Sequence, residues 1–195
     1  MSPRPLKVTD DEVFEAAQRA MARLGPAELT LADIAAEAGV TAGLLVQRFG
    51  SKRALLLRIM QRFSRGAAEM FAALRRGHRS PLAALRAYGE CMAGMAPTPA
   101  ALMRNLSYLQ MDLTDPAFRP HMLARARATR HELHKLIRDA VAGGELAAGT
   151  NVRQLARTIE AVIGGSLLGW ALHQDGPAAK WLRDDLNAVL KPYSK

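Results

Sequence analysis

The sequence has little of what disulfide-bonded, membrane-spanning or metal-binding proteins need. It contains a single cysteine, Cys91, so no disulfide can form within the chain, and no Cys/His cluster has the spacing of a metal site. It has no run of about 18 uncharged apolar residues, and its N-terminal residues lack an apolar secretory core. We therefore expect a cytoplasmic protein with no membrane span, no metal and no cofactor, and we expect Cys91 to be a small core residue.

Motifs of the common enzyme classes are also missing. There is no Gly-rich phosphate loop, no nucleophile elbow and no His-Glu-x-x-His sequence. The five histidines have no recognisable catalytic spacing; they are His78, His121, His131, His134 and His173. The sequence therefore argues against an enzyme, and a helical adaptor or a membrane-surface protein is the stronger alternative to a DNA-binding protein.

Strand-like alternation and internal repeats are absent, and the hydrophobic residues recur at helical spacing. With 49% hydrophobic residues, the chain can bury an ordinary core. The fold we predict is all-α. The helices, separated by Pro and Gly, are expected over residues 9–24, from 52 onward, and over 81–95, 103–113, 118 or 120 to 142, 151–173 and 178–190.

The most informative segment is residues 30–52, which has the spacing of a helix, a glycine turn and a second helix. Ile34 and Ala35 give the first helix an apolar face, and Gly39 suits a turn that needs a positive φ. Thr41 can cap the second helix, on which we expect Leu44, Leu45 and Phe49 to pack inward. From this motif alone, an ordinary αα-hairpin stays open as an alternative.

The helices expected on either side of the motif help to decide between a DNA-binding motif and an ordinary αα-hairpin. A helix ending at Gly25-Pro26 precedes the motif, and Ser51 caps a long helix that opens with Lys52. This arrangement resembles the TetR family of bacterial repressors, at motif level over residues 9–58 and in architecture over the rest. The resemblance implies a DNA-binding domain at residues 1–53 and an effector-binding and dimerisation domain at 54–195. It also implies contacts with double-stranded operator DNA from Thr30, Thr41, Ala42, Gly43, Val46, Gln47, Arg48 and Lys52.

The sequence departs from the family pattern at two of these positions. Val46 stands where the family usually has an aromatic residue, most often Tyr, and Arg48 where it often has His. Valine cannot bond a phosphate as a tyrosine hydroxyl can. Arg48 can compensate, because a guanidinium binds phosphate or reads a guanine edge.

Positive charge begins where the second helix of the motif begins. The whole chain carries a net charge of +9, but residues 1–41 hold 4 basic and 7 acidic side chains. Residues 42–79 hold 9 basic side chains, including Arg65, against only Glu69. This distribution favours a nucleic-acid partner. From Arg62 onward we expect the basic residues to form a solvated surface.

The segment 161–172 is apolar almost all round, so it must be buried on every side. The segment by itself is equally consistent with a central core helix and with a helix shared between two copies. The resemblance implies the second, a homodimer formed through residues 151–173 and 178–190. The expected interface residues are Ile163, Gly164, Gly165, Leu167, Leu168, Trp170, Leu186 and Leu190.

The resemblance also implies a small-molecule effector held by helices between residues 55 and 142. Flexible apolar side chains suit such a site, although a stripe of this kind is more often plain core. The candidates are Met60, Phe63, Met70, Met92, Met95, Met103, Leu106, Tyr108, Leu109 and Gln110. Taken together, these inferences describe a repressor that a small, largely apolar ligand releases from a palindromic operator.

Overall fold

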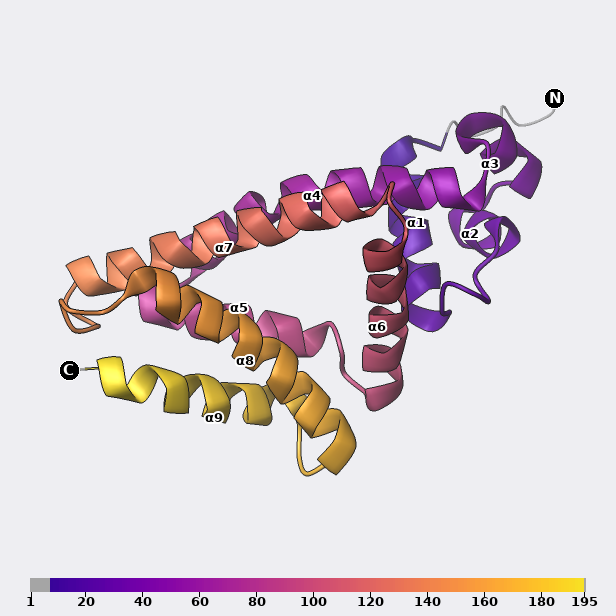
Figure 1. Ribbon diagram of the computed structural model, residues 1–195. Helices are drawn as coiled ribbons and strands as arrows, with labels where there is room; N and C mark the ends of the chain where they lie inside the picture. Colours follow the sequence, from indigo (N-terminus) through magenta and orange to yellow (C-terminus); the bar gives the residue numbers. More distant parts are fainter. Residues whose placement is uncertain (1–7, 195) are drawn as a thin grey trace. The chain divides into compact units, whose positions relative to one another are not determined.

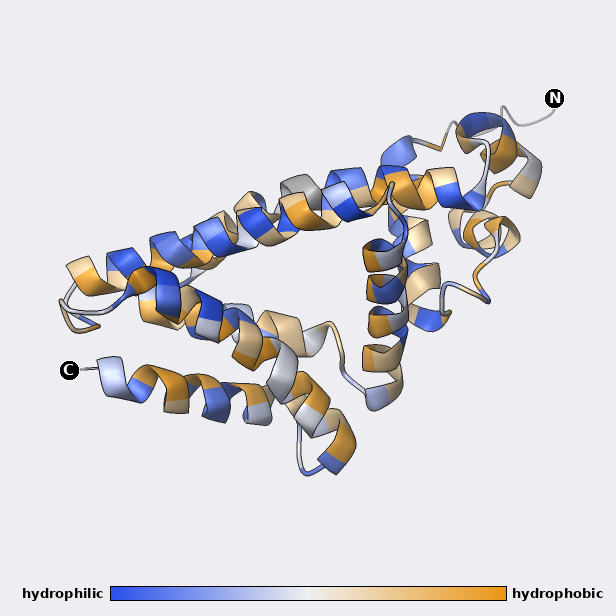
Figure 2. Ribbon diagram, in the orientation of Figure 1, coloured by the Kyte–Doolittle hydropathy of each residue, from blue (hydrophilic) through white to orange (hydrophobic). Residues whose placement is uncertain are grey.

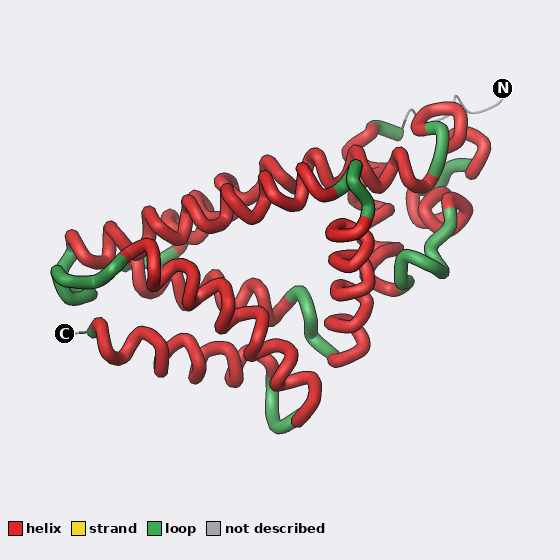
Figure 3. The backbone as a smooth tube through the Cα atoms, viewed as in Figure 1, coloured by secondary structure: helices red, strands yellow, loops and turns green. Residues whose placement is uncertain are grey.

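A computed structural model of the chain describes residues 8–194, apart from the side chains of Ser64 and Arg65. Residues 1–7 of the expected DNA-binding domain, and the side chain of Arg65 in the basic run, therefore lie outside the described part. Within that part the chain forms helices and loops with no strand, and only an isolated bridge joins Leu146 and Ser194 (Figure 3). The all-α prediction is confirmed.

The helices follow the order of the predicted segments (Figure 1). Most carry hydrophobic and hydrophilic residues on different sides, as amphipathic helices do (Figure 2). Their bounds are α1 Asp10–Arg23, α2 Leu31–Ala38, α3 Ala42–Phe49, α4 Lys52–Gly77, α5 Pro81–Gly94, α6 Pro99–Thr114, α7 Arg119–Ala142, α8 Val152–His173 and α9 Ala178–Leu190, with a short 3-10 helix at Lys191–Tyr193.

The chain divides into two compact units, of which the first comprises residues 1–62 and 104–119. Its core joins α1, α2, α3 and the start of α4, with Phe14, Ile34 and Leu45 buried. Most of α6 belongs to this unit as well, because Tyr108 Oη donates to the carbonyl of Leu24 at 2.9 Å. The first unit thus extends beyond the helix-turn-helix segment.

Two further polar contacts bind the α6 region to the first unit. Arg104 Nε donates to the carbonyl of Ala22 at 3.0 Å. Arg53, in the first turn of α4, donates two hydrogen bonds of 2.8 Å to the carboxylate of Asp115, just after α6. This pairing lowers the pKa of Asp115. Side-chain hydrogen bonds from arginine therefore hold the segment 104–119 to the rest of the first unit near its start and again just after α6.

The second unit comprises residues 63–103 and 120–195, and α8, α9 and α5 pack together within it. The crossing of α5 and α9 is close, since a Cβ added at Gly89 would lie 2.5 Å from Leu186 Cδ1. On α5 the buried residues are on the side of Leu85 and Tyr88. Cys91 is exposed, so the expectation that it is a core residue is wrong.

A buried carboxylate joins α4 and α7 in the second unit. Glu132 is 5% exposed, and its side chain accepts hydrogen bonds from Arg75 at 2.6 Å and from Lys135 at 2.8 Å. Burial alone would raise the pKa of Glu132, but these two cations outweigh it and lower the pKa. Glu132 is therefore ionised and paired in the folded chain.

Candidate nucleic-acid interface

Three threonines begin the helices of the candidate DNA-binding region. Thr30 accepts a hydrogen bond from the backbone N–H of Asp33 at 3.2 Å and donates its own hydroxyl and N–H to the Asp33 carboxylate, which completes a capping box. Thr9 and Glu12 form the same motif at α1. Thr41 caps α3 by accepting from Leu44 N at 3.2 Å. Local sequence thus fixes where each helix starts.

The turn between α2 and α3 depends on one glycine. Gly39 has φ 67° and ψ 29°, a left-handed conformation that a residue with a Cβ adopts at a cost. The N–H of Val40 then donates to the carbonyl of Ala35 at 2.9 Å, which closes the end of α2. Gly39 therefore sets the angle between the two helices of the motif.

Packing decides which side of α3 is available to a partner. Leu45 is fully buried and Phe49 is 5% exposed, with the Phe49 ring centroid 6.0 Å from that of Phe14. Leu44, in contrast, is 40% exposed, so the expectation that it packs inward is wrong. The four-residue spacing of Leu45 and Phe49 fills the inner side, and Leu44 is turned about 100° away from it.

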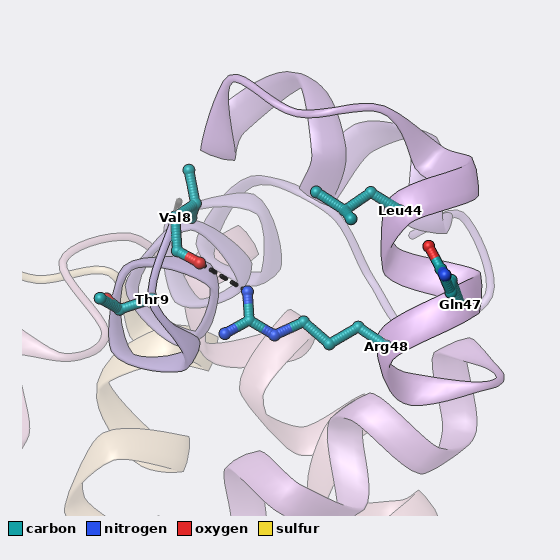
Figure 4. A pocket seen from close by; sticks show the side chains of 5 residues that line it. All are labelled: Val8, Thr9, Leu44, Gln47 and Arg48. Carbon is teal, nitrogen blue, oxygen red and sulfur yellow. Dashed lines mark hydrogen bonds between the residues drawn. The ribbon is translucent and has the colours of Figure 1, made fainter. Parts of the chain in front are cut away.

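The outward side of α3 carries most of the DNA-contact residues expected from the sequence. Thr41, Gly43, Val46 and Gln47 are exposed, and Ala42 is half-buried. An open depression of about 560 Å³ adjoins this side; Val8, Thr9, Leu44, Gln47 and Arg48 line it. Figure 4 shows Leu44 and Gln47 on α3, and Arg48 extending from α3 toward Val8.

Arg48 makes two bonds within the chain. Its guanidinium donates to the carbonyl of Val8 at 2.6 Å (Figure 4). It also forms an ion pair with Asp10, at the start of α1. Its side chain is 31% exposed and lies over the ring of Phe49, 5.6 Å from the centroid. Val8 and Asp10 were not expected at this site, because they lie about 40 residues from Arg48 along the chain and no sequence signal marks the contact.

Lys52 is similarly engaged at the start of α4. Its ammonium donates to the carbonyls of Pro26 at 2.9 Å and Leu29 at 2.7 Å. These two carbonyls belong to the loop between α1 and α2. Lys52 therefore holds the loop that precedes the capping residue Thr30, and any phosphate contact from Lys52 comes in addition to this structural role.

The comparisons identify the family. Residues 13–59 match the model described as bacterial regulatory proteins, tetR family, and residues 107–186 match the model described as tetracyclin repressor-like, C-terminal domain. Together the two models match well over half of the chain. The chain belongs to the TetR family. TetR-family proteins are DNA-binding transcriptional regulators rather than enzymes, which also decides against the αα-hairpin and adaptor alternatives.

Solved structures share the TetR fold over nearly the whole chain, and no curated protein matches the sequence significantly. A protein from Saccharomonospora viridis in complex with choline has a TM-score of 0.77 at 20% identity, covering 93% of this chain and 95% of its own. A TetR transcription regulator from Haloarcula marismortui has a TM-score of 0.74 at 17% identity, covering 95% and 98%. SmeT, the repressor of the Stenotrophomonas maltophilia multidrug efflux pump SmeDEF, has a TM-score of 0.68 at 22% identity, covering 97% and 92%.

In this TetR-family chain the expected dimer residues fall into two groups. Ile163, Leu167, Trp170, Leu186 and Leu190 are buried within the protomer. The others are not: Gly164, Gly165 and Leu168 are exposed on α8, with Leu168 45% exposed. By length and hydropathy alone α8 is apolar enough to cross a membrane, but a helix in a protein core passes the same test, and 39% of its most apolar stretch is buried.

The expected effector residues are divided between the two units. Phe63, Met70 and Met92 are half-buried in the second unit, whereas Met95 and Met103 are more than half exposed. The remaining candidates belong to the first unit: Met60 and Tyr108 are buried, Leu106 and Leu109 are half-buried, and Gln110 is exposed. Tyr108 has a defined structural role there, and burial raises its pKa to about 12, so it is a neutral hydrogen-bond donor at any physiological pH.

Proposed function

We propose that this protein is a repressor that binds a palindromic operator as a homodimer and is released by a small, largely apolar ligand. The observation that carries the proposal is the outward side of α3, which is exposed in a capped helix-turn-helix of a TetR-family chain. Two copies related by a two-fold axis would present two such helices to two half-sites of a palindrome. Thr41, Ala42, Gly43, Val46 and Gln47 are the proposed direct contacts.

The homodimer is supported by a stripe of small and apolar residues on α8. Its members are exposed and recur at intervals of three or four residues, with two adjacent glycines at one of the positions: Ala161, Gly164, Gly165, Leu168 and Leu172. The two glycines have helical geometry, and a Cβ added to either would have no heavy atom within 4 Å. Nothing inside the protomer therefore requires glycine there, although glycine lowers helix stability by about 1 kcal/mol relative to alanine. A close crossing with α8 of a second copy gives a reason for both.

The effector site is proposed in the second unit, around Phe63 and Met70 of α4 and Met92 of α5. These side chains are half-buried and apolar, and a methionine can adapt to ligands of different shape. The guanidinium of Arg125 lies over the Phe63 ring, 5.7 Å from its centroid. Because α4 also begins at the DNA-binding segment, a ligand that displaces Phe63 or Met70 can change the orientation of that segment.

DNA binding is tested by fluorescence anisotropy with the intergenic DNA beside the protein's own gene. We expect specific binding that Gln47→Ala weakens, with Gln110→Ala, an exposed change on α6 of the same unit, as a matched control. Sequence-specific recognition would be contradicted by two results together. One is equal affinity for this DNA and for scrambled DNA of the same composition, and the other is that selection from a random DNA pool yields no duplex that binds more tightly.

Release by ligand is tested through reciprocity. A ligand found by its effect on the melting temperature is titrated into free and operator-bound protein. If it lowers operator affinity by a factor between about 5 and 150, operator DNA must lower its affinity by the same factor. Equal ligand affinity in the two titrations would show that the site is not an inducer site.

A further inference from the structure

The exposed side chains of α3 are apolar or neutral, and none of them carries a charge. Val46 is 50% exposed and Leu44 is 40% exposed, and Gln47 is the exposed polar residue between Leu44 and the end of the helix. Leu44 and Gln47 are three residues apart, so they are neighbours on one side of α3. The exposed side chains within α3 thus comprise two aliphatic groups and one amide.

Arg48 is the only charged residue in the sequence of α3, and it is held away from that surface. Its guanidinium donates to the carbonyl of Val8 (Figure 4) and pairs with Asp10 at the start of α1. A charge-assisted pair that is half-buried must be broken before the same nitrogens can reach a guanine. Arg48 is therefore already used to fasten α3 to the start of α1.

In the major groove each base presents a different set of hydrogen-bonding and apolar groups. Guanine O6 and N7 are read by Arg or Lys, and cytosine N4 by Asp or Glu. Adenine N6 and N7 are read by the amide of Asn or Gln, and the thymine methyl group is contacted by apolar side chains. The free side chains of α3 match adenine and thymine, and the one side chain that suits guanine is engaged.

The start of α3 is also shaped for close approach. Gly43 lies in the first turn, and a Cβ added there would have Thr41 Oγ1 at 4.0 Å as its nearest neighbour. Packing within the chain does not require a glycine at this position. A base edge or sugar lying against the helix would require it, and would bring Leu44, Val46 and Gln47 within reach of the groove floor.

We propose that α3 selects A·T pairs, with Leu44 and Val46 on thymine methyl groups and Gln47 on an adenine, while Arg48 is a positioning residue that fixes α3 rather than a reader of guanine. The proposal rests on the proposed function, because it requires α3 to enter the major groove of an operator. It replaces the DNA contact, to a phosphate or to a guanine edge, expected of Arg48 from the sequence.

The experiment selects half-sites from a random DNA pool with the full-length protein. It then measures affinity for the selected duplex with each thymine replaced in turn by deoxyuridine, which removes only the methyl group. We expect A·T pairs at the positions that α3 contacts, and a loss of about fourfold at one or more thymines, the value of one buried carbon group. Leu44→Ala or Val46→Ala should abolish that sensitivity, and Gln47→Ala should relax selection at one adenine.

Arg48→Ala gives the decisive comparison. We expect it to lower the melting temperature and weaken binding to all sequences alike, leaving the selected sequence unchanged, and Asp10→Asn should do the same more mildly. A guanine that wild type selects and Arg48→Ala no longer selects would overturn the proposal, as would a duplex indifferent to every uridine replacement. If no sequence is enriched at all, the proposed function fails instead, so the two failures are distinguishable.

Discussion

Gly165 on α8 allows the dimer to be tested by a change that should have opposite effects on the protomer and on the assembly. Gly165 is exposed, is near the middle of a helix that runs from Val152 to His173, and has open space where a Cβ would be. In the isolated protomer, Gly165→Ala removes the helix cost of glycine and adds about 1 kcal/mol of stability. For a chain of this length, that corresponds to a rise in Tm of about 2–4 °C.

In the proposed dimer the same methyl group is added to both copies, where two α8 helices cross. Overpacking a close contact costs about 1–3 kcal/mol, which is roughly a 5–150-fold weaker association. Leu168→Asp, on the same stripe, buries an unpaired carboxylate in the dimer and should give monomers outright. Operator affinity should fall with either change, since a monomer engages only one half-site.

Sedimentation velocity over a range of protein concentrations measures the association, and thermal melts at the lowest concentration measure the protomer. Gly66→Ala is the matched control, because Gly66 is inside α4, away from the α8 stripe, and also has no atom within 4 Å of an added Cβ. We expect the control to raise Tm without changing association. If Gly165→Ala behaves as Gly66→Ala does, or if wild type is a monomer at micromolar concentration, α8 is not the dimer interface.

Three further changes test contacts that the structure defines. Lys52→Ala leaves the carbonyls of Pro26 and Leu29 without their donor, so we expect a loss of about 1.5–3 kcal/mol in urea unfolding; an unchanged midpoint would refute the structural role. Glu132 has a lowered pKa, so its pairing stabilises the fold fully above the unfolded-state value of 4.5 and the contribution is lost as pH falls through the lower folded value. Glu132→Gln should therefore destabilise the protein at pH 7 and flatten the acid side of the stability curve, and a parallel curve would contradict this. Tyr108→Phe should cost about 1 kcal/mol, measured by Tm, through the lost bond to Leu24.

Local signals were sufficient for much of the fold. Threonine caps and acidic partners three residues later set the starts of α1 and α2, and Gly39 set the turn before α3, because each acts through atoms only a few residues apart in the chain. The four-residue spacing of Leu45 and Phe49 also placed the inner side of α3. Read strictly, the same spacing excludes Leu44 from that side.

Long-range contacts could not be obtained in this way. The partners of Arg48 are about 40 residues away, and those of Lys52 more than 20, so only the folded chain shows that these two cations are already bonded. The placement of most of α6 in the first unit depends on Tyr108 and Arg53, whose partners are still farther along the chain.

The apolar segment 161–172 shows most clearly what the sequence determined and what only the tertiary structure decided. Its composition determined that every side of the helix should be buried, because exposing apolar surface to water is unfavourable. Composition could not assign each side to a partner. The tertiary structure did so by packing α9 and α5 against α8. This packing buries Ile163, Leu167 and Trp170 and leaves Gly164, Gly165 and Leu168 exposed. The physical reason is that a side of a helix is buried within the protomer only where another element of the same chain packs against it.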